Sequence, residues 1–177
     1  MHRNNLLLLL NNYSPSRDEA SFKQHMIDFI QKYPDCFERS LAIGHITASC
    51  MLVNKQNTHA LLLHHAKLGQ WFQLGGHCDG NSDVLAVAIK EAQEESGIHE
   101  IQPLSETIFD IDIHVIPSNK KEQAHFHFDV RFLLQVQGDQ DVIQNSESKE
   151  LRWITKDITA LPTNNPSVVR LFEKWVN

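Results

Sequence analysis

Residues 75–98 read GGHCDGNSDVLAVAIKEAQEESGI, a glycine-rich turn that runs into a stretch of helical periodicity. The pattern predicts a helix over residues 82–96. Glu91, Glu94 and Glu95 recur at i, i+3 and i+4, so they share an arc of about 100° on the helix surface. Each like-charge pair of this kind destabilises a helix by about 0.2–0.5 kcal/mol. The acidic cluster therefore needs a physical explanation.

Two explanations of the acidic cluster compete. Three carboxylates on one face are tolerated where water screens them, which is the usual state of an isolated cluster. Alternatively, a divalent cation turns the repulsion into coordination. Mg²⁺ takes one or two carboxylates, keeps several waters and shares its other positions with substrate phosphates. The context favours the cation, because glycines let the backbone approach a ligand, helix-end amides stabilise anions, and Gly97 is placed as a C-terminal cap.

The stretch resembles the Nudix box, whose pattern is Gly-x5-Glu-x7-Arg-Glu-U-x-Glu-Glu-x-Gly-U, where U is aliphatic. The matching residues are Gly76, Glu91, Glu94, Glu95, Gly97 and Ile98, with Ala92 at the first aliphatic position. Two positions differ, because Ser82 replaces the first glutamate and Lys90 replaces the arginine. Ser82 can serve as the helix N-cap, and Lys90 keeps the charge without the planar fork that orients the glutamates. We expect catalytic activity to survive both changes.

The resemblance extends beyond the box. Residues 71–77 and 125–132 are similar to a bacterial Nudix subgroup that carries an N-terminal helical extension. The resemblance implies an α+β fold, a Nudix-like α/β/α sandwich with a mixed β-sheet, preceded by N-terminal helices. It also implies hydrolysis of the pyrophosphate bond of a nucleoside diphosphate linked to another moiety, with Mg²⁺ or Mn²⁺ as the cofactor. The alternatives are a Nudix-fold ligand-sensing or partner-binding module without catalysis, and a plain scaffold with a solvated acidic face.

The resemblance also implies roles for individual residues. The metal ligands would be Glu91, Glu94, Glu95 and the carbonyl of Gly75. The catalytic residues would be Glu91, Glu94 and Lys90. The general base stays open, and Lys90 would hold the carboxylates in register. The substrate would contact Gly76, His77, Phe72, His127 and Glu147, with Glu150 as an alternative to Glu147 and Trp153 as a further contact.

Histidines gather near the same stretch. His125, His127 and Asp129 alternate along one predicted strand and so share a face, and His77 and Cys78 lie in the glycine-rich turn. These residue types are zinc ligands, but their spacing matches no structural zinc motif. We therefore expect them to line the pocket or to face water.

The N-terminal part of the chain is helical in pattern. Five consecutive leucines at residues 6–10 predict a short helix that docks on the core. Apolar residues at helical spacing over residues 22–33 predict a second helix, and Ser16 and Glu19 before it have the spacing of a capping box.

The remainder of the chain alternates polar and apolar residues, which is typical of half-buried strands. Pro166 at a first helical position predicts a closing helix. The predicted strands cover residues 46–53, 59–63, 71–74, 110–115, 125–136 and 151–154. We divide the chain into an N-terminal helical extension packed on the core, residues 1–43, and a Nudix hydrolase domain, residues 44–177.

Composition limits the partners. The chain has 177 residues, 41% of them hydrophobic and 21% charged, with a formal net charge of −6, so a broad basic nucleic-acid surface is not expected. The leucine run is too short to span a membrane. Three cysteines without a CxxC pair indicate a reducing compartment, so we expect a cytoplasmic protein acting on a small diphosphate. The oligomeric state stays open.

Overall fold

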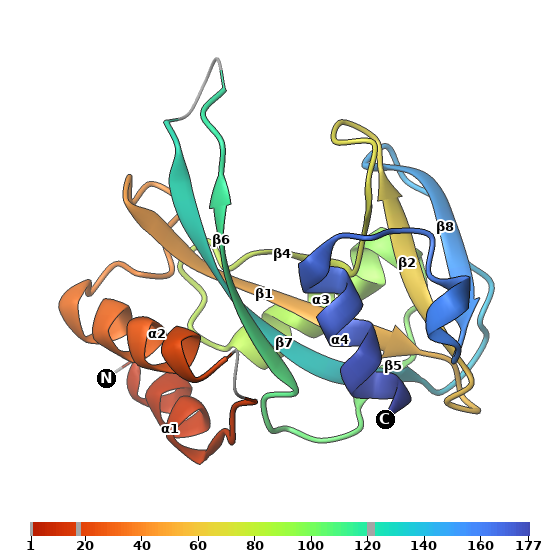
Figure 1. The fold of residues 1–177 in the computed structure, drawn as a ribbon, viewed down its shortest axis with the longest axis horizontal. Helices are drawn as coiled ribbons and strands as arrows, with labels where there is room; N and C mark the ends of the chain where they lie inside the picture. Colours follow the sequence, from red (N-terminus) through yellow and green to blue (C-terminus); the bar gives the residue numbers. More distant parts are fainter. Residues whose placement is uncertain (1, 17–18, 120–122) are drawn as a thin grey trace.

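A mixed, curled β-sheet of eight strands forms the middle layer of the fold (Figure 1). The computed structural model describes residues 2–16, 19–119 and 123–177. The strands are β1 (Gly44–Val53), β2 (His59–His65), β3 (Trp71–Phe72), β4 (Leu74–His77), β5 (Ile101–Pro103), β6 (Asp110–Ile116), β7 (His125–Val136) and β8 (Ser148–Thr155). The helices are α1 (Asn4–Asn12), α2 (Ala20–Lys32), α3 (Val84–Ser96) and α4 (Pro166–Val176), with a short 3₁₀ turn at Ile158–Ala160.

The sheet is built around β1. Its main path runs β3-β2-β1-β7-β5, while β4 pairs with β1, β6 with β7 and β8 with β2. The β1–β7 pair is parallel, with Gly44 opposite Phe126 and Val53 opposite Gln135. The other pairs are antiparallel, including the predicted β1–β2 hairpin. The mixed sheet expected from the sequence is therefore confirmed.

Helices cover both faces of this sheet. Successive residues of a strand point to opposite faces, so β1 contributes to two cores. Ile46, Ala48 and Cys50 belong to the core that includes α1, α2 and α3, whereas Met51 and Val53 belong to the core that includes α4. Figure 1 shows α4 in front of the strands and α3 behind them. The predicted α/β/α sandwich is confirmed.

The two N-terminal helices pack into the same core as α3. The side chains of Leu6, Leu10 and Met26 are fully buried there. Phe29 stacks on Phe128 of β7, with a ring-centroid distance of 4.0 Å. Burial of each such side chain stabilises the fold by about 1.5–3 kcal/mol, so the helices predicted from the leucine run and from the periodicity after it have a clear structural role.

Two local expectations about the strand-to-helix region are wrong. Residues 71–74 do not form one strand. β3 pairs with β2, whereas β4, which begins at Leu74, pairs with β1. The N-cap of α3 is Asp83 and not Ser82: the Asp83 side chain accepts a hydrogen bond from the backbone N–H of Ala86 at 3.1 Å. Gly97 ends the helix with a φ of 75°, as predicted.

Of the capping box expected before α2, one of the two hydrogen bonds is observed. The helix begins after Glu19, and Arg17 and Asp18 of the box lie outside the described residues. Glu19 does accept a hydrogen bond from the Ser16 backbone N–H at 2.8 Å. However, it is fully buried and is also bound by the Tyr13 hydroxyl and by Lys174 of α4, at 2.7 Å for Lys174 Nζ. Its main role is to join distant parts of the chain.

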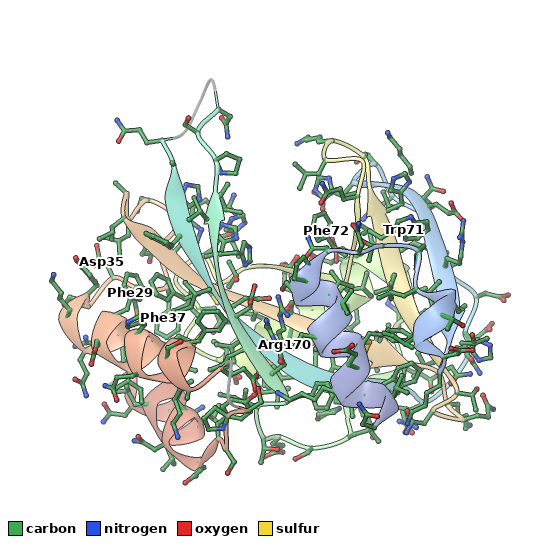
Figure 2. The ribbon with its side chains drawn as sticks, in the orientation of Figure 1. Phe29, Asp35, Phe37, Trp71, Phe72 and Arg170 are labelled. Atoms are coloured by element: carbon green, nitrogen blue, oxygen red, sulfur yellow. The ribbon has the colours of Figure 1, made fainter. Side chains whose placement is uncertain are left out.

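A buried ionic network connects α4 to the sheet. Arg131 of β7 is 1% exposed and lies 2.8 Å from Asp129 and 3.0 Å from Asp110. Arg170 of α4 reaches Asp112 of β6 at 2.9 Å, and Figure 2 shows Arg170 beside the sheet. Buried charges are stable only when they are paired, so this network fixes α4 on the β6–β7 pair.

No helix within the described parts of the chain is long and apolar enough to cross a membrane.

Candidate active site at the glycine turn and the acidic helix

The backbone of β4 lies directly against β1 and α3. A Cβ atom on Gly75 would lie 2.2 Å from the Ser49 Cβ of β1, and one on Gly76 would lie 2.4 Å from Glu91 Oε2 of α3. Gly75 also has a φ of 155°, a conformation that favours glycine. Residues 75–77 of the glycine turn (residues 75–80) are part of strand β4 and not of a loop. The two glycines allow this strand to approach the acidic helix more closely than any side chain would permit.

The three predicted carboxylates differ in their surroundings. Glu95 is 7% exposed and accepts a hydrogen bond from the Gly75 N–H at 2.9 Å. The Glu91 side chain is 17% exposed and faces Gly76, whereas that of Glu94 is 58% exposed. Lys90 bridges the two more exposed groups, at 3.2 Å to Glu91 Oε1 and 2.8 Å to Glu94 Oε2. The structure thus brings Gly75, Gly76 and the acidic cluster together.

The negative charges in this cluster are poorly compensated. Burial, together with the neighbouring carboxylates of Glu91, Glu147 and Glu94, raises the pKa of Glu95 to about 8 against the lowering effect of the Gly75 N–H. Burial also raises the pKa of Glu91, although Lys90 opposes this. A divalent cation would stabilise the ionised form of both groups. Carboxylate and carbonyl oxygens are the donors that Mg²⁺ and Mn²⁺ prefer, so the residues present fit such an ion.

The two downstream carboxylates occupy different positions. The charge of Glu147 raises the pKa of both Glu91 and Glu95, which places it on the side of the acidic cluster. Glu150 lies on β8 and forms an ion pair with Arg152 at 2.6 Å. Of these two alternatives, only Glu147 adds to the charge at the cluster.

The predicted substrate contacts fall into two groups. Phe72 lies on β3, which pairs with β2 (Figure 2), and its ring is edge-on to His65 with a centroid distance of 6.3 Å. His77 and His127 lie together, with ring centroids 5.1 Å apart. Strands β2 and β1 separate β3 from β7 in the sheet, so the two groups belong to different parts of it. Trp153 donates its indole N–H to the Gln140 carbonyl at 3.3 Å.

The histidines form a closer group than the sequence indicated. His125 and His127 do share a face, with ring centroids 5.3 Å apart. Sequence reasoning missed His45, which is 2% exposed and lies directly opposite His127 in the parallel β1–β7 register. A single histidine in a predicted strand does not by itself indicate a functional site. Only the pairing of strands that are far apart in the sequence brings His45 to the others.

Comparison with known proteins agrees with this geometry. The model of the NUDIX domain family matches residues 44–175. The fold and the acidic helix after a glycine turn define the class of Nudix pyrophosphohydrolases, and the chain belongs to the NUDIX family. No curated protein sequence matches the chain.

Several solved structures share the fold. A MutT protein from Methanosarcina mazei Go1 is 20% identical, with a TM-score of 0.58, covering 76% of this chain and 94% of its own. The dihydroneopterin triphosphate pyrophosphohydrolase of E. coli is 14% identical, with a TM-score of 0.57 and coverages of 74% and 94%. An Ap4A hydrolase from C. elegans is 18% identical, with a TM-score of 0.55 and coverages of 73% and 93%.

Proposed function

We propose that this protein hydrolyses the pyrophosphate bond of a nucleoside diphosphate linked to another moiety, and that it requires Mg²⁺ or Mn²⁺. The observation that carries the proposal is the position of Glu91 and Glu95. Both carboxylates are withdrawn from water and held against the backbone of Gly75 and Gly76, with Glu95 fixed by the Gly75 N–H at 2.9 Å. Repulsion between partly buried carboxylates is unfavourable unless a cation offsets it.

The proposed metal ligands are Glu91, Glu94, Glu95 and the Gly75 carbonyl. Glu91 and Glu95 are one helical turn apart and are the more buried pair, which suits direct coordination. Glu94 is more exposed, so it is a further ligand or the general base. A bound ion of this kind stabilises charge on phosphoryl oxygens and makes a coordinated water more acidic.

The chain's own residues would orient the reacting groups. Lys90 bonds both Glu91 and Glu94 and so keeps these carboxylates in register. Glu94, Glu91 or Glu147 would accept the proton of the attacking water, and the choice among them stays open. The backbone of Gly76, which lies against the Glu91 side chain, would contact the diphosphate. We propose His77, His127 and Phe72 as contacts for the rest of the substrate. For the two histidines this requires a moiety that extends past β4 to the face opposite Glu91.

Two structural relatives support a phosphoanhydride substrate. One is an Ap4A hydrolase and another is a dihydroneopterin triphosphate pyrophosphohydrolase. The non-catalytic alternative is favoured only by Ser82 and Lys90, which depart from the family pattern. All three glutamates are retained, and a ligand-binding module has no physical need for their mutual repulsion.

The proposal is tested with a panel of nucleoside diphosphate derivatives incubated with Mg²⁺ or Mn²⁺. Products are identified by mass spectrometry, and phosphate release is followed after phosphatase treatment. We expect cleavage between the two phosphates of at least one compound, and complete loss of turnover when EDTA is added. Saturable binding of these compounds without any product would instead support the ligand-sensing module.

We further propose that residues 1–43 are a helical extension of a catalytic domain formed by residues 44–177, which is consistent with the family match that begins at residue 44. A cytoplasmic location is part of the same proposal. It is supported by Cys36, Cys50 and Cys78, which are all unpaired and buried.

A further inference from the structure

Three histidines from different strands converge beside the glycine turn. His45 of β1, His77 of β4 and His127 of β7 each offer a ring nitrogen, and the three nitrogens lie within 4.8 Å of one another. The ring centroids are 5.0 Å apart for His45 and His77, 4.8 Å for His45 and His127, and 5.1 Å for His77 and His127. We call these three residues the histidine cluster.

The histidine cluster and the acidic cluster lie on opposite faces of β4. Gly76 faces α3, since its added Cβ would contact Glu91. Successive strand residues point to opposite faces, so His77 points away from α3. It points toward the face that carries Ser49 and Asp129, whose side chains are hydrogen-bonded to each other at 2.7 Å. The two clusters therefore do not share ligands.

The cluster offers the donors that a zinc-class ion requires. His127 Nε2 is buried and has no hydrogen-bond partner among the described residues. Neutral imidazole is the form that binds a metal. A buried ring nitrogen without a partner is unfavourable unless something binds it.

Other zinc-ligand types nearby are excluded by their own contacts. The Asp129 carboxylate already accepts hydrogen bonds from Thr47 at 3.0 Å, from Ser49 at 2.7 Å and from Arg131 at 2.8 Å. The Cys78 sulfur does not belong to the group of ligand atoms that converge within 4.8 Å of one another. The donor set is therefore made of imidazoles.

We propose that His45, His77 and His127 together bind one transition-metal ion of the zinc class. Three histidines with a fourth position left to water or substrate is the arrangement of a catalytic type of zinc site. Zinc–nitrogen bonds of about 2.0–2.1 Å in tetrahedral geometry place ligand atoms roughly 3.3–3.4 Å apart. Ligand atoms within 4.8 Å of one another must therefore close by at most roughly 1.5 Å when the ion binds, through changes in the histidine side-chain torsions. His77 and His127 are partly exposed, so an ion and a fourth ligand can reach the site.

Two further histidines support the cluster from outside. The ring centroid of His114 is 5.5 Å from that of His127, and the His114 ring nitrogen bonds Asp112 at 3.0 Å. The ring centroid of His125 is 5.1 Å from that of His45. The rings of His114 and His125 lie beside the histidine cluster, but their nitrogens do not converge with those of the cluster. We therefore do not count them among the ligands.

The proposal is tested by titrating Co²⁺ into the metal-stripped full-length protein and recording its visible absorption spectrum. We expect intense tetrahedral d–d bands that saturate at one Co²⁺ per chain, without a thiolate charge-transfer band, and displacement of Co²⁺ by one equivalent of Zn²⁺. Both His77→Ala and His127→Ala should weaken binding by more than about 100-fold, beyond the usual effect of a residue that only supports a ligand. His99→Ala, in the exposed loop after α3, is the matched control and should bind normally.

A second variant separates this site from the acidic cluster. Glu91→Gln with Glu95→Gln should abolish Mn²⁺ binding, measured by electron paramagnetic resonance, yet leave the Co²⁺ spectrum unchanged. Circular dichroism checks that each variant is folded. The proposal is overturned if Co²⁺ gives no tetrahedral bands, if both histidine variants bind Co²⁺ as tightly as the wild type, or if the glutamate variant loses the Co²⁺ site as well. None of these outcomes depends on finding a substrate.

Discussion

Gly75 and Gly76 are adjacent, yet each has a different reason to lack a side chain. An added Cβ on Gly75 meets Ser49 Cα at 2.5 Å and the Ala48 carbonyl oxygen at 2.7 Å, which are backbone atoms of the central strand. An added Cβ on Gly76 meets the end of the flexible Glu91 side chain. The first position therefore controls the packing of β4 on β1, and the second controls the position of one proposed ligand.

Alanine substitutions at the two glycines should have different effects, one on activity and the other on stability. In Gly76→Ala, Glu91 must move away from the turn, so we expect kcat/KM with Mg²⁺ to fall by about 10–100-fold, while the melting temperature changes little. In Gly75→Ala, two strands must separate and the backbone is strained, so we expect a loss of stability of about 1–3 kcal/mol. Steady-state kinetics and thermal unfolding of the two variants measure both effects. Equal loss of stability in both would contradict this assignment.

At the scale of single elements, α3 shows how far local sequence determines structure. The sequence predicts the helical periodicity of α3, its acidic face and its end at Gly97, because each of these features depends on residues close together in the chain. Its N-cap was misplaced by one residue. Asp83 and Ser82 are both common caps, and the choice between them depends on the path of the preceding loop, where Asn81 Oδ1 accepts the Asp83 N–H at 3.0 Å.

The cap provides a matched pair of variants. Asp83→Ala removes the side-chain oxygen that satisfies the Ala86 N–H, so we expect it to lower the free energy of unfolding by about 1 kcal/mol. Ser82→Ala removes no cap and should change stability by less than about 0.5 kcal/mol. Urea unfolding followed by circular dichroism measures both. A larger effect for Ser82→Ala than for Asp83→Ala would restore Ser82 as the cap.

At the scale of the whole molecule, much of the structure depends on contacts that no local pattern reveals. Glu19 and Lys174 are 155 residues apart in the sequence and lie 2.7 Å apart in the fold. The alternating sequence of β7 does not distinguish Arg131 from its neighbours, yet Arg131 lies at the centre of the buried ionic network. His45 reaches His127 only through the parallel β1–β7 register. The family pattern predicted the sheet and the acidic cluster, but it carries no information on these long-range pairs.

The ionic network predicts how stability depends on pH. Burial by itself raises the pKa of Asp112, but its hydrogen bond with His114 and the charges of Arg131 and Arg170 outweigh burial and hold the pKa well below its usual range. A lowered pKa in the folded state means that the unfolded chain binds the proton more tightly. The resulting stabilisation is complete above the unfolded pKa of about 3.9 and is lost as the pH falls below it.

Unfolding in urea at pH values between 3 and 6 measures this dependence. We expect Asp112→Asn to have a lower free energy of unfolding than the wild type at pH 6. Its free energy of unfolding should also decline less steeply at low pH, with a slope smaller by up to about 1.4 kcal/mol per pH unit for one proton. Asp35→Asn, at an exposed position near the end of α2 (Figure 2), is the control and should keep the wild-type slope. An unchanged slope in Asp112→Asn would show that this carboxyl does not contribute.

The most direct measurement for catalysis by the acidic cluster is the kcat/KM of Glu95→Gln on a cleaved diphosphate in the presence of Mg²⁺. We predict a loss of at least about 1,000-fold, because several kcal/mol of charge stabilisation depend on this ligand. The melting temperature of the metal-free variant should be unchanged or higher, since the pKa of Glu95 is raised to about 8 and its charge is unfavourable in the fold. Turnover close to that of the wild type in a folded Glu95→Gln protein would contradict the assignment.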